Sequence, residues 1–231
     1  MFVYAHRGAS ALAPENTLLA IKQASEAGAD GIEFDVYQHQ NEFILIHDRW
    51  VDRTTNGKGT IDSMSFEQVR SLDAGKGEQI PTLSEVLALI GARCQINIEM
   101  KGVHDIELLI DYVAKHCRQH KVPSSNILFS SFDHHVLKHL KRYRPDARIG
   151  ALTAGNPLDY ALFAQQLDAE FANIDLTFVN QAFIEDAKQR GLKVGVYTVN
   201  HTEDLDKMKS WGVDAVFCND PGEALAIING G

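Results

Sequence analysis

Short apolar runs alternate with amphipathic stretches along almost the whole chain. This alternation predicts an α/β protein in which parallel strands are joined by helices. Eight strands are expected, at residues 2–6, 31–37, 95–101, 126–132, 147–153, 171–176, 193–199 and 215–219. Helices are expected near residues 16–27, 82–91, 105–119, 133–143, 157–167, 180–190, 203–211 and 221–229. Eight strand–helix units favour a closed (β/α)8 TIM barrel over an open sheet.

One interval breaks this rhythm. Residues 43–47 form an extra apolar run, and residues 49–80 are polar, contain glycines and hold one short helical pattern near 65–72. Loops of this length inside a domain are usually functional or disordered. The segment follows the second expected strand, whose carboxyl end lies where barrel enzymes keep their active sites. We therefore expect 49–80 to form a small cap within a single catalytic domain that covers residues 1–231.

Length and charge narrow the function classes. The 231 residues suit one α/β barrel, and 22 basic against 31 acidic side chains give a net charge of −9, which argues against nucleic acid or an anionic membrane as the main partner. No charged leader precedes an apolar segment, and no apolar run reaches about 18 residues, so we expect a cytoplasmic protein without membrane insertion. The three cysteines are widely spaced and are expected to be reduced.

Acidic side chains gather on two expected strands. Glu33 and Asp35 stand two residues apart, so in a strand they share one face, and Glu99 and Lys101 repeat that spacing on the next strand. Neighbouring strands lie about 4.8 Å apart, so the three acids can converge. Three oxygen ligands without cysteine favour one Mg²⁺ or Ca²⁺ over Zn²⁺. The alternative, an exposed strand with a solvated acidic face, fits less well because the intervening residues are apolar.

Two cations and two histidines stand at neighbouring strand ends. Arg7 and Lys101 beside a dication would suit the oxygens of a phosphate group. Of the ten histidines, His6 and His47 are the two that lie at strand ends close to the acids. Imidazole titrates near neutrality, so this pair can act as general base and general acid. A structural role for both histidines is the competing interpretation.

Several short motifs in the sequence resemble those of the glycerophosphodiester phosphodiesterase family. The matching motifs run in order over nearly the whole chain: HRG at 6–8, PENT at 14–17, E-x-D at 33–35, HD at 47–48, E-x-K at 99–101, YTVN at 197–200 and NDP at 219–221. The resemblance implies the same barrel with a small insertion, and hydrolysis of a small glycerophosphodiester to sn-glycerol 3-phosphate and an alcohol such as choline, ethanolamine or glycerol. It also implies roles for seven residues: metal ligation by Glu33, Asp35 and Glu99, acid–base catalysis by His6 and His47, and phosphate contacts from Arg7 and Lys101.

Other residues of the same motifs receive weaker assignments. Asn16 and Thr17 are expected to cap the first helix, whereas Glu15 is expected to face the pocket and orient His6 or Arg7. Phe132 ends the fourth expected strand, where it packs at the barrel mouth or lines the glycerol side of the substrate. Tyr197 stands where the family often has tryptophan, which can alter how the glycerol or the leaving alcohol packs.

Three other functions are alternatives to glycerophosphodiester hydrolysis. A phospholipase-like lyase of the same fold would need an exposed apolar rim, and residues 49–80 are too polar to supply one. A non-catalytic barrel that binds metal or phosphate is disfavoured by the two histidines beside three acids, and a Schiff-base aldolase is disfavoured because Lys101 beside a glutamate stays protonated. The nucleophile is either water or the substrate's own 2-hydroxyl, and analogy with related phospholipase-type barrels favours the hydroxyl. The head group, the metal and the oligomeric state stay open.

Overall fold

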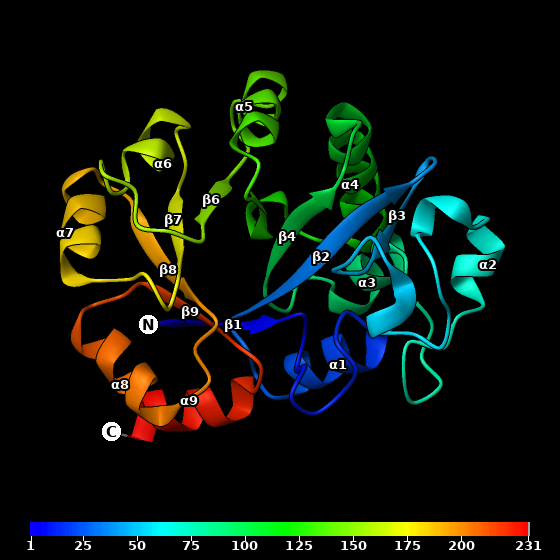
Figure 1. The fold of residues 1–231 in the computed structure, drawn as a ribbon, viewed down its shortest axis with the longest axis horizontal. Helices are drawn as coiled ribbons and strands as arrows, with labels where there is room; N and C mark the ends of the chain where they lie inside the picture. Colours follow the sequence, from blue (N-terminus) through cyan, green and yellow to red (C-terminus); the bar gives the residue numbers. More distant parts are fainter. Residues whose placement is uncertain (231) are drawn as a thin grey trace.

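The computed structural model describes residues 1–230, whose strands close into a ring surrounded by helices (Figure 1). The hydrogen-bonded strand order is β1-β9-β8-β7-β6-β5-β4-β2-β3, and β1 also pairs with β2. All pairs within the ring are parallel. The ring strands are β1 (Phe2–His6), β2 (Gly31–His39), β4 (Gln95–Gly102), β5 (Ile127–Ser131), β6 (Ile149–Thr153), β7 (Phe171–Asp175), β8 (Lys193–Tyr197) and β9 (Ala215–Cys218). The expected (β/α)8 TIM barrel is confirmed.

Helices alternate with the ring strands. They are α1 (Leu18–Glu26), α2 (Phe66–Arg70), α3 (Leu83–Ile90), α4 (Ile106–His120), α5 (His134–Tyr143), α6 (Leu162–Gln166), α7 (Gln181–Gln189), α8 (Thr202–Ser210) and α9 (Pro221–Gly230). Gly28, Gly191 and Gly212 follow α1, α7 and α8 with positive φ, a conformation in which glycine meets no steric penalty. The helix expected at 157–167 is wrong over its first half, because the Asn156-Pro157 segment turns instead and α6 starts only at Leu162.

The interval after β2 adds one strand outside the ring. Strand β3 (Glu42–Leu45) pairs antiparallel with the far end of β2, from Val36–Leu45 to His39–Glu42. Two 3-10 turns, Val51–Arg53 and Ile61–Ser63, and helix α2 follow. This segment has an apolar cluster of its own, formed by Ile44, Ile46, Val51, Ile61, Val69, Ala74 and Ile80. The extra elements are thus anchored to the strand that carries two of the candidate acids.

Strand β2 shows how the pattern positions the site. Ile32, Phe34 and Val36 point outward into the apolar layer beneath the helices, so Glu33 and Asp35 must point into the barrel. A separate apolar group inside the ring contains Tyr4, Leu128, Phe171, Ala215 and Phe217.

The three cysteines are free thiols, with Cys117 and Cys218 buried and Cys94 half-buried. Burial raises the pKa of Cys94 and Cys117 to about 11 and that of Cys218 to about 12. Among residues 1–230, no helix is long and apolar enough to span a membrane.

Candidate active site

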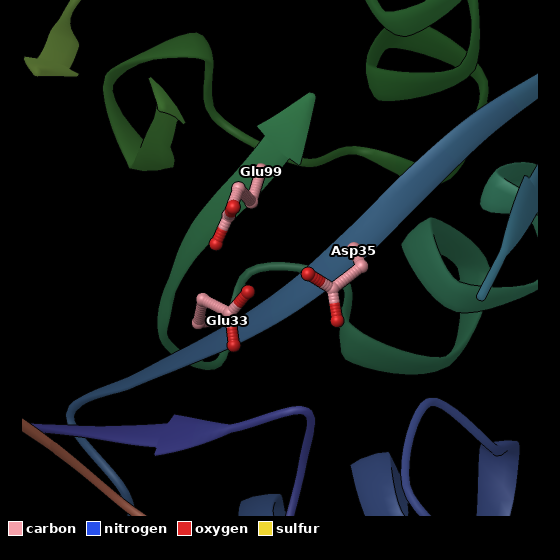
Figure 2. Close-up of side chains that lie close together, drawn as sticks. All are labelled: Glu33, Asp35 and Glu99. Atoms are coloured by element: carbon pink, nitrogen blue, oxygen red, sulfur yellow. The ribbon is translucent and has the colours of Figure 1, made fainter. Parts of the chain in front are cut away.

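Three buried carboxylates meet inside the barrel. Glu33 and Asp35 come from β2 and Glu99 from β4, where Asp35 and Glu99 stand opposite each other in the strand register. One oxygen from each residue lies within 4.8 Å of the others, and Figure 2 shows the three carboxylates turned toward a common space. Their residues are at most 7% exposed. Three carboxylates held this close require positive charge nearby.

Two cationic side chains supply part of that charge. Lys101 Nζ lies 2.5 Å from a carboxylate oxygen of Glu99 and 3.6 Å from one of Asp35. Arg7 Nε lies 3.3 Å from the other Asp35 oxygen, and the backbone N–H of Arg7 donates to Glu33 at 2.9 Å. Two cations against three carboxylates leave one negative charge, which the protein groups described so far do not offset.

The pKa values of two of the carboxyl groups, Glu33 and Glu99, are raised, as this excess of negative charge predicts. Burial, followed by repulsion from Asp35, raises the pKa of Glu99 to about 7, and burial with the same repulsion raises the pKa of Glu33 well above its ordinary value. Burial lowers the pKa of Lys101, but the neighbouring Glu99 and Asp35 carboxylates outweigh it and raise that pKa overall. A raised pKa keeps Lys101 protonated, which disfavours the Schiff-base alternative.

Asn16 holds Asp35 in place. Its amide nitrogen donates to Asp35 Oδ2 at 2.9 Å, and its oxygen accepts the backbone N–H of Asp35 at 3.1 Å. The side chain is 3% exposed, and its backbone φ is +58°. The expectation that Asn16 caps a helix is wrong, because Thr17 is the N-cap of α1 and accepts from the N–H of Ala20. Asparagine tolerates the left-handed conformation, which is the one sequence signal that points to this role.

His6 lies at the carboxyl end of β1, next to Glu33 in the register. Its Nδ1 is 2.9 Å from the side-chain oxygen of Asn219. Because that oxygen accepts, Nδ1 carries the proton and Nε2 is left as the basic nitrogen. Burial, followed by the charge of Arg7, lowers the pKa of His6 to about 4, so the ring is neutral near pH 7.

His47 follows β3 and belongs to a chain of charged contacts. Its Nδ1 donates to Asp48 at 2.6 Å, and the other oxygen of Asp48 accepts from Arg53 Nε at 2.5 Å. Arg53 also donates to both oxygens of Glu15, at 2.8 and 2.9 Å, and Glu15 accepts from Arg7 at 2.9 Å. These contacts connect the segment 49–80 to the acid cluster. Glu15 contacts Arg7, which is one of the two partners expected for it. The role of Arg53 could not be predicted, because no motif or residue spacing in the sequence points to it.

Two aromatic rings border the cationic side of the cluster. The Phe132 ring lies 5.1 Å from Lys101 Nζ and packs edge-on against Tyr197 at 5.9 Å. The Tyr197 hydroxyl donates to the carbonyl of Thr153 at 2.7 Å, which fixes the ring at the ends of β8 and β6. Phe132 is 42% exposed, so an apolar surface adjoins the charged cluster.

Comparison with known proteins gives a consistent result. The model of the glycerophosphoryl diester phosphodiesterase family matches residues 6–223. A glycerophosphodiester phosphodiesterase of Caldanaerobacter subterraneus is 34% identical over 239 residues, covering 99% of this chain and 98% of that protein. The structure of an Oleispira antarctica phosphodiesterase in complex with the product sn-glycerol-3-phosphate is 30% identical, with a TM-score of 0.90 over 99% of this chain and 97% of that one. A glycerophosphodiester phosphodiesterase from Agrobacterium tumefaciens has a TM-score of 0.82 at 27% identity, over 98% of this chain and 99% of that one.

Proposed function

Because this chain belongs to the glycerophosphoryl diester phosphodiesterase family and is a phosphodiester hydrolase, we propose that it cleaves small glycerophosphodiesters with one divalent metal ion and a His6/His47 pair. The products would be sn-glycerol 3-phosphate and an alcohol such as choline, ethanolamine or glycerol. The product complex of the Oleispira relative supports this substrate class. The observation that carries the proposal is the meeting of Glu33, Asp35 and Glu99 within 4.8 Å.

The three carboxylates fit a hard divalent cation. They offer only oxygen ligands, and Oε1 of Glu33 is buried without a hydrogen-bond partner. Mg²⁺ and Ca²⁺ prefer such ligands, so Glu33, Asp35 and Glu99 would hold the ion. When bound, the ion would neutralise charge on a phosphate oxygen and acidify a nearby hydroxyl. With the ion present the local charge would be about +1, which suits a singly charged phosphodiester.

The cationic side chains would hold the phosphate. Arg7 and Lys101 line the cluster, and their charges would stabilise the transition state, in which negative charge on the phosphate oxygens increases. Glu15 pairs with Arg7 Nη1 at 2.9 Å, while Arg7 Nε lies 3.3 Å from Asp35. Phe132 and Tyr197 would pack against the glycerol, because they adjoin Lys101 and present apolar surface.

The two histidines would divide the proton transfers according to their surroundings. His6 is neutral near pH 7 and presents Nε2 as an acceptor, so it would take the proton of the nucleophile. His47 donates through Nδ1 to the Asp48 carboxylate, which orients its ring, so it would protonate the leaving alcohol through Nε2. The nucleophile would be the glycerol 2-hydroxyl, which gives a cyclic phosphate before water opens it.

An activity assay with glycerophosphocholine tests the proposal. We expect choline release that requires Mg²⁺ or Ca²⁺ and is lost in Glu99→Ala while the far-UV circular dichroism is unchanged. Unchanged turnover after chelation would show that the metal assignment is wrong, and the absence of turnover with every metal would favour a non-catalytic barrel. Single-turnover phosphorus NMR should show the cyclic phosphate; direct transfer of ¹⁸O from water without that species would refute attack by the 2-hydroxyl.

A further inference from the structure

Two histidines form a pair on one face of helix α4. His116 and His120 are four residues apart, a spacing that makes two side chains neighbours on a helix. Their rings are nearly parallel, with centroids 6.0 Å apart, and both residues are half-buried. Helix α4 belongs to the layer outside the ring of strands (Figure 1), so this pair is separate from the acid cluster and has no part in the proposed function.

His116 is held by contacts on two sides. Its Nδ1 lies 2.8 Å from Oγ of Ser84, in the first turn of α3. The Tyr112 ring lies 4.3 Å from the His116 ring, and the Tyr112 hydroxyl donates to Glu42 at 3.0 Å. When Nδ1 donates to Ser84, the lone pair of His116 is on Nε2. A ring N–H bonded to an oxygen is the arrangement that orients metal-binding histidines in proteins.

His120 has a ring nitrogen that the protein does not satisfy. Its Nε2 is buried and has no hydrogen-bond partner among the described residues. A buried polar atom without a partner is unfavourable, and such atoms are uncommon in proteins. A metal ion that accepts the lone pair of this nitrogen would remove the penalty.

The distance and the protonation state both suit one shared ion. A metal ion about 2.0–2.1 Å from an imidazole nitrogen lies about 3.2 Å from the ring centroid, so two rings on one ion have centroids at most about 6.4 Å apart. The observed 6.0 Å is within that limit. Burial, followed by the charges of Lys115 and His120, lowers the pKa of His116. The His116 ring is therefore neutral near pH 7, and its lone pair is available.

We propose that His116 and His120 form a binding site for one divalent transition-metal ion of the class of Zn²⁺, Ni²⁺ and Cu²⁺. Imidazole nitrogens suit these ions, whereas Mg²⁺ and Ca²⁺ prefer oxygen ligands. Within residues 1–230, no His, Cys, Asp or Glu joins the pair in a group of three, so water would fill the remaining positions on the ion. A bound ion would stabilise the folded protein, because the unfolded chain does not hold the two rings together.

Helix α5 carries the same spacing in different surroundings. His135 and His139 are also four residues apart, but both are exposed, and His139 pairs with Glu107 at 3.5 Å. Bringing two exposed rings onto one ion costs side-chain entropy, whereas the contacts of His116 have already ordered its ring. The α5 pair is therefore the matched control for the α4 pair.

Titration calorimetry with Ni²⁺, in excess Mg²⁺ that competes for oxygen ligands, tests the site. We expect the affinity for Ni²⁺ to fall about 100-fold in His120→Ala, because one imidazole lacks the advantage of two linked ligands. Ser84→Ala should weaken binding about tenfold, because the His116 ring loses the oxygen that orients it. His135→Ala should bind Ni²⁺ as tightly as the wild type.

Two further measurements separate the loss of a ligand from the loss of the fold. Without Ni²⁺, His120→Ala should unfold at nearly the same temperature as the wild type. With Ni²⁺ at 100 times its dissociation constant, the wild type should gain about 5–10 °C more in Tm than His120→Ala gains. Electron paramagnetic resonance with one equivalent of Cu²⁺ should show two nitrogen ligands in the wild type and fewer in His120→Ala.

The proposal has clear contrary outcomes. Equal Ni²⁺ affinity in the wild type and in His120→Ala would overturn it. Equal losses in His120→Ala and His135→Ala would show chelation by surface histidines in general and would overturn it as well. None of these measurements follows turnover, so a failure of the proposed phosphodiesterase activity would leave the result unaffected.

Discussion

Asn16→Gly tests whether a buried amide positions the acid cluster. The substitution removes both hydrogen bonds to Asp35. Glycine accepts the φ of +58° without steric cost, so the change isolates the loss of the amide. Asn16→Ala removes the same bonds and in addition places a Cβ in the left-handed conformation.

The magnitude follows from the two bonds. Losing the bond to the Asp35 carboxylate costs about 1.5–3 kcal/mol, and leaving the buried N–H of Asp35 unpaired costs about 1–3 kcal/mol. Arg7 and Lys101 still contact the carboxylate, so we expect the free energy of unfolding to fall by about 3–5 kcal/mol in Asn16→Gly. Asn16→Ala should lose about 1 kcal/mol more. Misplacement of Asp35 should weaken binding of Mg²⁺ or Ca²⁺ about 10- to 100-fold.

Denaturant unfolding measures the first quantity, and titration calorimetry with each metal measures the second. The matched control is Asn56→Gly, which removes an exposed asparagine side chain that accepts the backbone N–H of Asp73. This control should lose about 1 kcal/mol or less and bind metal normally. If Asn16→Gly binds metal as tightly as the wild type and unfolds at the same denaturant concentration, Asn16 does not position the site.

Two further expectations concern the histidines. Arg53→Ala should lower kcat/KM for glycerophosphocholine about 10- to 100-fold, because Arg53 fixes the Asp48 carboxylate that orients His47. The control is Arg49→Ala, which removes an arginine that pairs with Asp62 in the same segment and should have no effect. Equal losses in both variants would contradict the role of Arg53. His6 has an ordinary pKa of 6.5 when unfolded and about 4 when folded, so the wild type should lose stability as pH falls from 6.5 to 4, by at most about 3 kcal/mol. His6→Gln should remove that part of the pH dependence, measured by denaturant unfolding at each pH, and an unchanged slope would count against the burial of a neutral ring.

The barrel could be predicted because its signals are periodic. Each ring strand is a short apolar run, and glycines at the helix ends mark where several helices stop. The meeting of Glu33, Asp35 and Glu99 follows from the alternation along β2 and β4 and from the parallel register between them. No loop conformation has to be known for that step.

The parts that could not be predicted depend on loops. Asn16 reaches Asp35 because Asn16 itself, just before α1, has a left-handed backbone conformation. No repeat of apolar residues in the sequence predicts that turn. Arg53 meets Glu15 across 38 positions of sequence, a contact that only the folded segment 49–80 brings about.

The low reactivity of the three native cysteines allows a fluorescent label to be attached at one chosen position. All three native cysteines have pKa values raised to about 11 or 12, so few thiolates form near pH 7 and reaction with maleimides is slow. A cysteine introduced at Leu158, which is 99% exposed, would react first and carry a polarity-sensitive fluorophore. Such a labelled protein would report binding near the loop after β6 as a change in emission, without removal of any native cysteine.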